Sequence, residues 1–247
     1  MLCCHRFLKM AESLSSSNLK LETLQRTVMQ CRRCPRLVEY REKVAREKRR
    51  MFRDWDYWGK PVPSFGDPKA ELLIVGLAPA AHGANRTGRM FTGDRSGDFL
   101  FRALYEAGYA SQPEGRDRED GLQLRRCYIT AALRCAPPAN KPLPQELRNC
   151  QPYLESELEI LGRVRAVLAL GKIGFDRYLA VVAEHLELPP RSRMPFGHGV
   201  SYELPGGLPR LFASYHPSQQ NTQTGKLTPA MMHDVLAGID KYLRATL

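Results

Sequence analysis

Four short apolar runs recur along the chain and are separated by longer segments with helical periodicity. The runs cover residues 72–77, 127–133, 166–170 and 211–215, and a polar or glycine-containing turn follows each of them. Apolar runs of this length are typical of strands that are buried on both faces of a sheet. The pattern therefore predicts four buried strands.

Amphipathic segments fill the intervals between these runs and follow the last one. Helical spacing is found at 95–107, 144–161, 172–186 and 229–245, and a further periodic stretch over 11–30 leads into a cysteine pair. Strands that alternate with helices favour a parallel sheet covered on both faces. We expect an α/β fold of three layers, α/β/α, around a four-stranded, mainly parallel sheet.

Length and composition add a prediction of domain organisation. A chain of 247 residues with 43% hydrophobic residues can bury a substantial core, and no shift in composition demands a second domain. We expect one domain over 19–247 after a flexible extension over 1–18, and a monomer.

Charge narrows the class of partner. Lys and Arg exceed Asp and Glu by 37 − 26 = +11, and the sequence pI is about 9.5, which favours a polyanion. Nucleic acid is favoured over an anionic membrane, because no run approaches the roughly 18 apolar residues of a membrane span. The first ten residues do not resemble a secretory signal, so we expect a soluble, cytoplasmic, nucleoid-associated protein with reduced thiols.

A basic segment over 41–53 is followed by Trp55, Tyr57 and Trp58. It is consistent with a phosphate-binding arm. It is equally consistent with a solvated helix face and a surface loop packed by its own aromatic rings.

Four cysteines have the spacing of a metal site that joins distant segments. Cys31 and Cys34 form a C-x2-C pair, and Cys135 and Cys150 follow after a hundred residues. A C-x2-C pair lets two thiolates converge on one metal centre from a single turn. Buried or unrelated thiols remain the alternative. We expect Cys127 in the core, and Cys3 and Cys4 lie in the predicted extension.

Candidate chemistry gathers where the predicted strands end, which is where parallel sheets bind ligands. The loop GLAPAAHGANRTGRMFTGD at 76–94 lets backbone N–H groups approach a ligand and carries Phe91, an apolar ring suited to stacking on a base or to anchoring the loop. His216 follows the last strand in a His-Pro-Ser turn and could donate a hydrogen bond. Asn140 lies in a proline-flanked loop, where its amide could contact a base, orient a water or only form a turn.

These segments together resemble the uracil-DNA glycosylase superfamily, and most closely its iron–sulfur branch, family 5. The likeness covers nearly all of residues 19–245 and is carried by the motif at 76–94, by HPSQQNTQTGKLT at 216–228 and by the four cysteines. It implies excision of uracil from double-stranded DNA through a flipped base, and a structural 4Fe-4S cluster. The implied residues are Cys31, Cys34, Cys135 and Cys150 for the cluster, Asp94, Asn140 and His216 for catalysis, and Gly76, Ala78, Phe91, Ala131 and Ser218 for substrate binding.

Two departures from the wider superfamily are informative. Relatives with Gly-Gln-Asp or Gly-Ile-Asn position the attacking water with the third residue, which here is Ala78. The sister iron–sulfur family resembles Ile-Thr-Asn in the second strand, where the amide reads uracil, and here the position is Ala131. The resemblance therefore implies a broad range that includes hypoxanthine, with Asp94 and Asn140 as the remaining polar side chains.

Two other function classes stay open from the residues alone. The basic charge and the cysteines would permit a DNA-binding module that uses a metal site only for structure. A thiol redox enzyme is disfavoured, because such an enzyme needs a C-x2-C pair at a helix start in a thioredoxin-like unit, whereas here the pair follows a predicted helix and has distant partner cysteines.

Overall fold

The computed structural model describes residues 17–246. Its centre is one mixed sheet in the strand order β1-β3-β2-β4-β6-β5. The four inner strands are parallel: β2 (Leu72–Gly76), β3 (Cys127–Ala131), β4 (Ala166–Leu170) and β6 (Arg210–Ser214). These are the four strands that the apolar runs predict.

The number of strands in the sheet differs from the prediction. Two strands of two residues each, β1 (Phe65–Gly66) and β5 (Ser201–Tyr202), pair antiparallel with β3 and β6 at the two edges. The sheet therefore has six strands among the described residues, and the predicted total of four is wrong. Two-residue strands carry no alternating pattern, so the sequence does not reveal them.

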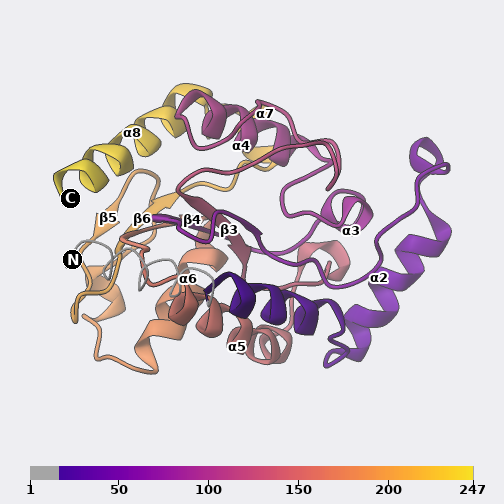
Figure 1. Cartoon of the computed structure of the whole chain (residues 1–247), viewed down its shortest axis with the longest axis horizontal. Helices are drawn as coiled ribbons and strands as arrows, with labels where there is room; N and C mark the ends of the chain where they lie inside the picture. The colour runs from indigo at the N-terminus through magenta and orange to yellow at the C-terminus, as the bar shows by residue number, and fades with distance from the viewer. Residues whose placement is uncertain (1–16, 247) are drawn as a thin grey trace, which may run out of the picture.

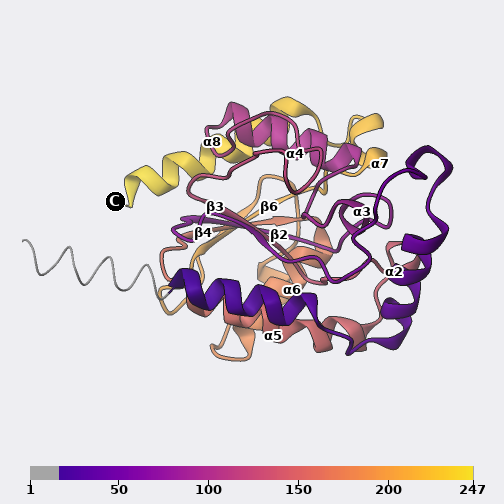
Figure 2. The ribbon, with the colours of Figure 1, turned by 45° about the vertical axis from the view of Figure 1, so that its right-hand side comes forward.

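Helices cover both faces of the sheet, which confirms the three-layer arrangement. Figure 1 shows α4 and α8 on one face and α5 and α6 on the other, and Figure 2 shows the same layers after rotation. The helices are α2 (Pro35–Glu47), α3 (Ala84–Thr87), α4 (Arg95–Glu106), α5 (Pro144–Ile160), α6 (Lys172–Ala183), α7 (Gln219–Gln223) and α8 (Pro229–Ala245), with short 3-10 turns η1 (Arg50–Phe52), η2 (Pro138–Asn140) and η3 (Arg191–Arg193).

The first described helix covers residues 17–29 and ends just before Cys31. The predicted extension over 1–18 lies outside the described residues as far as residue 16, and so do Cys3 and Cys4. No helix in the described part of the chain is long and apolar enough to cross a membrane.

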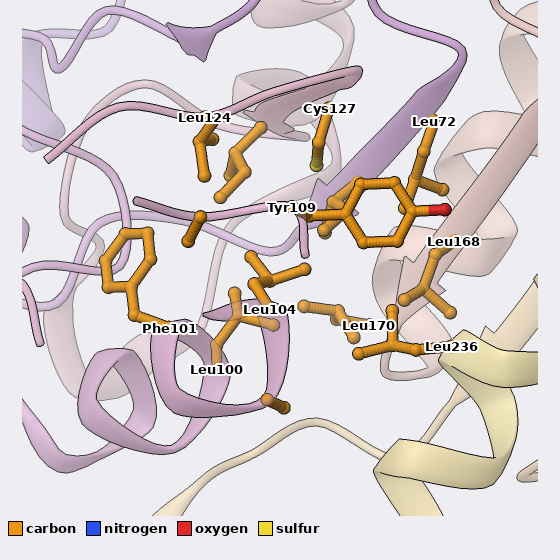
Figure 3. Packing of buried hydrophobic residues seen from close by; sticks show 14 of the residues in the cluster. Leu72, Leu100, Phe101, Leu104, Tyr109, Leu124, Cys127, Leu168, Leu170 and Leu236 are labelled. Atoms are coloured by element: carbon orange, nitrogen blue, oxygen red, sulfur yellow. The ribbon is translucent and has the colours of Figure 1, made fainter. Parts of the chain in front are cut away.

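Two hydrophobic clusters fix the sheet between its helices. Successive side chains of a strand point to opposite faces, so Leu72 and Ile74 pack on one side of β2 while Leu73 and Val75 pack on the other. Figure 3 shows the first cluster, in which leucines of α4 and α8 meet the strands. Cys127 is fully buried there, which confirms its predicted place in the core.

The strand register places the carboxyl ends of the inner strands level. Gly76 pairs with Ala131, and Leu170 pairs with Ser214. The loops that leave these strands therefore start side by side along one edge of the sheet. This edge carries the candidate site.

Candidate active site

A cavity of about 470 Å³ opens at the carboxyl ends of the parallel strands. Its lining includes seven of the eight residues that the sequence singles out for catalysis or substrate binding: Ala78, Phe91, Asp94, Ala131, Asn140, His216 and Ser218. Ala131, the last residue of β3, and the loops after β2, β3 and β6 supply them. Residues far apart in the sequence thus meet at one edge of the sheet, where α/β folds bind ligands.

Gly76 is the eighth residue, and it lies against the edge of the Phe91 ring. A Cβ atom at Gly76 would come within 2.8 Å of Phe91 Cζ, so only glycine leaves room for the ring. Phe91 itself has a φ of 52°, a left-handed conformation that is uncommon for a bulky residue. The close contact and the unusual backbone together fix the ring at the cavity.

The Phe91 ring faces the imidazole of His216. The two ring centroids are 5.8 Å apart with an interplanar angle of 29°, which is a stacked arrangement. His216 is held from behind, because Asn221 donates a hydrogen bond from Nδ2 to the His216 carbonyl oxygen at 2.8 Å. An aromatic ring and a hydrogen-bonding ring therefore border the same cavity.

Burial lowers the pKa of His216, and the negative charge of Asp94 opposes this shift only in part. The imidazole is therefore neutral at physiological pH and carries a single N–H group. A neutral imidazole can donate one hydrogen bond into the cavity without bringing a full charge.

Asp94 is both a wall of the cavity and the N-cap of α4. Its Oδ1 accepts a hydrogen bond from the backbone N–H of Gly97 at 3.0 Å. Its Oδ2 packs close to Gly83, where a Cβ atom would approach it to 2.4 Å. The cap fixes the carboxylate in place at the positive end of the helix.

Asn140 also lines the cavity, from the turn η2. Its φ is 55°, and its backbone N–H bonds to the carbonyl oxygen of Pro137 at 3.1 Å. Asparagine tolerates this left-handed conformation better than most residues. The turn between the prolines therefore gives Asn140 a defined place, with its side chain exposed.

A buried polar network lies behind the sheet edge and has no signature in the sequence. Glu157 of α5 is fully buried and accepts hydrogen bonds from Thr130 Oγ1 at 2.6 Å and from Arg134 Nη2 at 2.6 Å. Gln25 also donates to Glu157, at 3.0 Å, and Arg134 contacts Ser64 Oγ. The network ties β3 to α5 next to the cysteines.

The four predicted ligand cysteines border a second, smaller cavity. Cys31, Cys34, Cys135 and Cys150 line it together with apolar residues that include Leu37 and Leu133. Burial raises the pKa of Cys135 and of Cys150 to about 12. In the described residues, three or more His, Cys, Asp or Glu side chains are nowhere gathered closely enough to hold a single metal ion.

The four thiols line one apolar cavity, and thiolates are ligands for soft metal centres. Their arrangement suits a cluster of several metal ions better than a single ion. A cluster of several irons holds its thiolates farther apart than one ion does, and Cys thiolates are its usual ligands. The donor set and its surroundings therefore fit an iron–sulfur cluster.

Comparison with known proteins gives consistent matches over most of the chain. A family model described as "Uracil DNA glycosylase superfamily" matches residues 63–239. The matched stretch contains every residue that lines the 470 Å³ cavity.

Individual relatives give the same result. The type-5 uracil-DNA glycosylase of Thermus thermophilus is 54% identical over 215 residues, which cover 87% of this chain and 94% of that protein. The type-5 enzyme of Pyrobaculum aerophilum is 45% identical over 209 residues, covering 85% and 87%. The type-4 uracil-DNA glycosylase of Archaeoglobus fulgidus is 32% identical over 160 residues, covering 64% and 70%.

Proposed function

Since this chain belongs to the type-5 uracil-DNA glycosylases of the uracil-DNA glycosylase superfamily, we propose that it acts on damaged bases flipped out of double-stranded DNA. As a member of this class it is a hydrolase that cleaves the N-glycosyl bond of uracil in DNA repair. The observation that carries the proposal is the cavity at the strand ends, where the Phe91 ring stacks against His216.

The flipped base enters this cavity and stacks on Phe91. Flipping costs a few kcal/mol and is least costly for a mispaired base, so U·G is favoured over U·A. The contact between Gly76 and the ring edge supports this role, because it holds the ring in place before the base arrives. Ser218, whose hydroxyl caps α7, lies on the same wall and contacts the incoming nucleotide.

Bond breaking leaves the electron pair of the glycosidic bond on the base. His216 stabilises the negative charge that gathers on the carbonyl oxygen of the base by donating its N–H. One well-placed donor of this kind supplies about 3 kcal/mol to the transition state. The lowered pKa of His216 supports the use of the neutral imidazole.

Water then attacks the sugar carbon, which has the character of an oxocarbenium ion. The water oxygen bonds to that carbon and its proton passes to Asp94, with Asn140 helping to orient the water. Asp94 also stabilises the positive charge on the sugar. Both side chains line the cavity, and the cap at Gly97 leaves the Asp94 carboxylate capable of accepting a further hydrogen bond.

The range of bases is broad in this proposal. Ala78 and Ala131 line the cavity with methyl groups, so neither offers an amide or a carboxylate that would read uracil alone. Hypoxanthine, which is larger than uracil, is expected to enter the same space and to leave by the same route.

A 4Fe-4S cluster held by Cys31, Cys34, Cys135 and Cys150 is part of the proposal. When bound, it supplies structural cross-linking and takes no part in the chemistry. The helix over 17–29, α2, the segment after β3 and α5 all meet at these cysteines. We further propose that the protein works as a monomer in the cytoplasm, at the nucleoid.

The test is strand cleavage by alkali after incubation of the protein with duplexes that contain U·G, U·A or hypoxanthine·T, beside an unmodified duplex. Cleavage at the damaged base alone, fastest for U·G, is the expected result. Tight binding of all four duplexes without cleavage would overturn the proposal in favour of a DNA-binding protein without catalysis.

A further inference from the structure

A larger cavity, of about 900 Å³, adjoins the 470 Å³ cavity at the strand ends. The two cavities share part of their linings, namely Ala80, Asp94, Arg95, Asn140 and Gln219. The two cavities are therefore neighbours at the same edge of the sheet. When a DNA strand places one base in the 470 Å³ cavity, its neighbouring nucleotide lies one backbone step away. The 900 Å³ cavity is close enough to receive that neighbouring nucleotide.

The outer wall of the larger cavity carries large apolar side chains in contact with water. Met51 of η1 and Trp55 just after it line the cavity, with 71% and 37% of their surfaces exposed. Large exposed apolar groups that gather at one place mark binding sites, whereas single ones are ordinary. Tyr105 of α4, at 48% exposure, is an exposed ring that does not line this cavity.

Arg86 holds this aromatic wall against the loop that carries Phe91 and Asp94. Its guanidinium carbon lies 3.9 Å from the ring centroid of Phe52 and 4.1 Å from that of Trp55. Arg86 is only 4% exposed. Its Nε and Nη2 donate to the carbonyl oxygens of His82 and Gly93, each at 2.9 Å. Trp55 is therefore fixed with the guanidinium against its ring, while 37% of its surface stays open.

The charge of the cavity suits a phosphate. Its lining holds four arginines against two carboxylates, which are Arg49, Arg86, Arg95 and Arg116 against Asp94 and Asp98. Nη1 of Arg86 is buried and has no hydrogen-bond partner among the described residues, so part of this positive charge is not neutralised by a close contact. Positive grooves with aromatic platforms are the usual means of holding a single strand.

We propose that this cavity binds the nucleotide next to the flipped one in the same DNA strand, with its base stacked on Trp55 and its phosphate among Arg49, Arg95 and Arg116. This inference rests on the proposed function, because it requires that a flipped nucleotide occupies the 470 Å³ cavity. Arg86 is a positioning residue in it, since it holds Trp55 in place.

The test measures the affinity for single-stranded oligonucleotides, in which the opposite strand is absent. The probe carries a tetrahydrofuran abasic analogue at the target position, so that it cannot be hydrolysed. Two further probes also lack the base on its 5′ or its 3′ side. Trp55→Ala is compared with Trp55→Phe, which keeps a ring, and with Tyr105→Ala, which removes an exposed ring elsewhere.

Trp55→Ala is expected to weaken binding of the first probe by roughly 5- to 100-fold, the range for loss of one base–aromatic stack. Trp55→Phe is expected to recover most of this loss, and Tyr105→Ala to bind like the parent. On the probe that lacks the stacked neighbour, Trp55→Ala and the parent should bind equally. A loss of the same size on all three probes would overturn the proposal. So would parent-like binding of the first probe by Trp55→Ala.

The phosphate contact has a separate readout. The logarithm of the binding constant falls linearly with the logarithm of the salt concentration. Arg49→Ala should make this slope less steep by about 0.7 for a single strand, because one phosphate contact is lost. Arg163→Ala, which removes an exposed arginine just before β4, should leave the slope unchanged. Equal slopes for Arg49→Ala and the parent would remove Arg49 from the site. If the parent excised no base at all, the proposed function would fail instead, and that result is recorded independently of these affinities.

Discussion

The contact between Gly76 and Phe91 decides the shape of the base cavity at the scale of single residues. No atom of another residue type fits at Gly76, since a Cβ would lie 2.8 Å from Cζ and 2.9 Å from Cε2 of the ring. Because Phe91 already has a positive φ, the ring cannot be moved by a small backbone shift at low cost. The position of the Phe91 ring therefore depends on glycine at position 76.

Gly76→Ala is expected to displace the Phe91 ring and to lower single-turnover excision of uracil by about tenfold or more, which corresponds to about 1.4 kcal/mol. Gly238→Ala is the matched control, because a Cβ at Gly238 in α8 would meet no atom within 4 Å. The control should excise at the parent rate and gain stability through its higher helix propensity. Parent-like excision by Gly76→Ala would show that the ring position does not matter.

The neutral imidazole of His216 predicts a dependence on pH. Its pKa is lowered in the folded protein, so the neutral donor persists to a lower pH than in free histidine, whose pKa is about 6.5. Excision should be flat between about pH 7 and 8 and should fall only on the acid side. His216→Gln, which keeps an N–H donor without titration, should lose this acid limb. A parent rate that instead fell as the pH rose through about 6.5 would point to a protonated imidazole.

At the scale of elements, the buried pair of Arg134 and Glu157 joins β3 to α5. The two side chains are 2% and 0% exposed and lie 2.6 Å apart, with Thr130 and Gln25 completing the hydrogen bonds of the carboxylate. A paired and hydrogen-bonded charge is tolerated in the interior, whereas a lone one is costly.

Glu157→Gln is expected to lower the free energy of unfolding by about 3 kcal/mol, because it leaves the buried Arg134 charge uncompensated. Urea denaturation measures the change. Glu22→Gln provides the comparison, since its pair with Arg26 is largely exposed and should contribute less than about 0.5 kcal/mol. Equal stabilities of the two variants would contradict the role given to the network.

The elements also show which parts of the fold can be predicted from the sequence. The inner strands and α4, α5, α6 and α8 follow from apolar runs and helical spacing, because each buries a whole face or edge in the core. β1 and β5 are held by two pairs each at the sheet edges, and their residues carry no pattern. Local periodicity cannot report such pairing with a distant strand.

At the scale of the whole molecule, the candidate site can be predicted from the sequence only in part, because local patterns do not report contacts between distant segments. The loops at strand ends identify Phe91, Asp94 and His216, since parallel strands bring their carboxyl ends to one edge. The sequence does not indicate a role for Arg86, because this role depends on the rings of Phe52 and Trp55, which come from a different part of the chain. The burial of Glu157 cannot be read from the sequence, because an acidic residue in an amphipathic helix is normally exposed.

The cysteine site closes the molecule by joining its N-terminal helices to α5 and to the segment after β3. Cys135→Ala is therefore expected to abolish bound iron and sulfide and to lower the midpoint of thermal unfolding. Cys127→Ala serves as the control, because Cys127 is a buried thiol that packs in β3, away from the four predicted ligand cysteines. Chemical analysis of iron and sulfide, together with the visible absorption spectrum, measures the cluster content of both variants. Full iron content in Cys135→Ala would contradict the assignment.

The central claim is that uracil is excised in the cavity at the carboxyl ends of the strands. Single-turnover excision from a U·G duplex by the parent, His216→Ala and Asn140→Ala, with binding of the same duplex measured in parallel, tests it most directly. We predict that each substitution slows excision by about 10-fold or more while DNA binding changes little. Excision within about threefold of the parent in both variants, well under 1 kcal/mol, would contradict the claim.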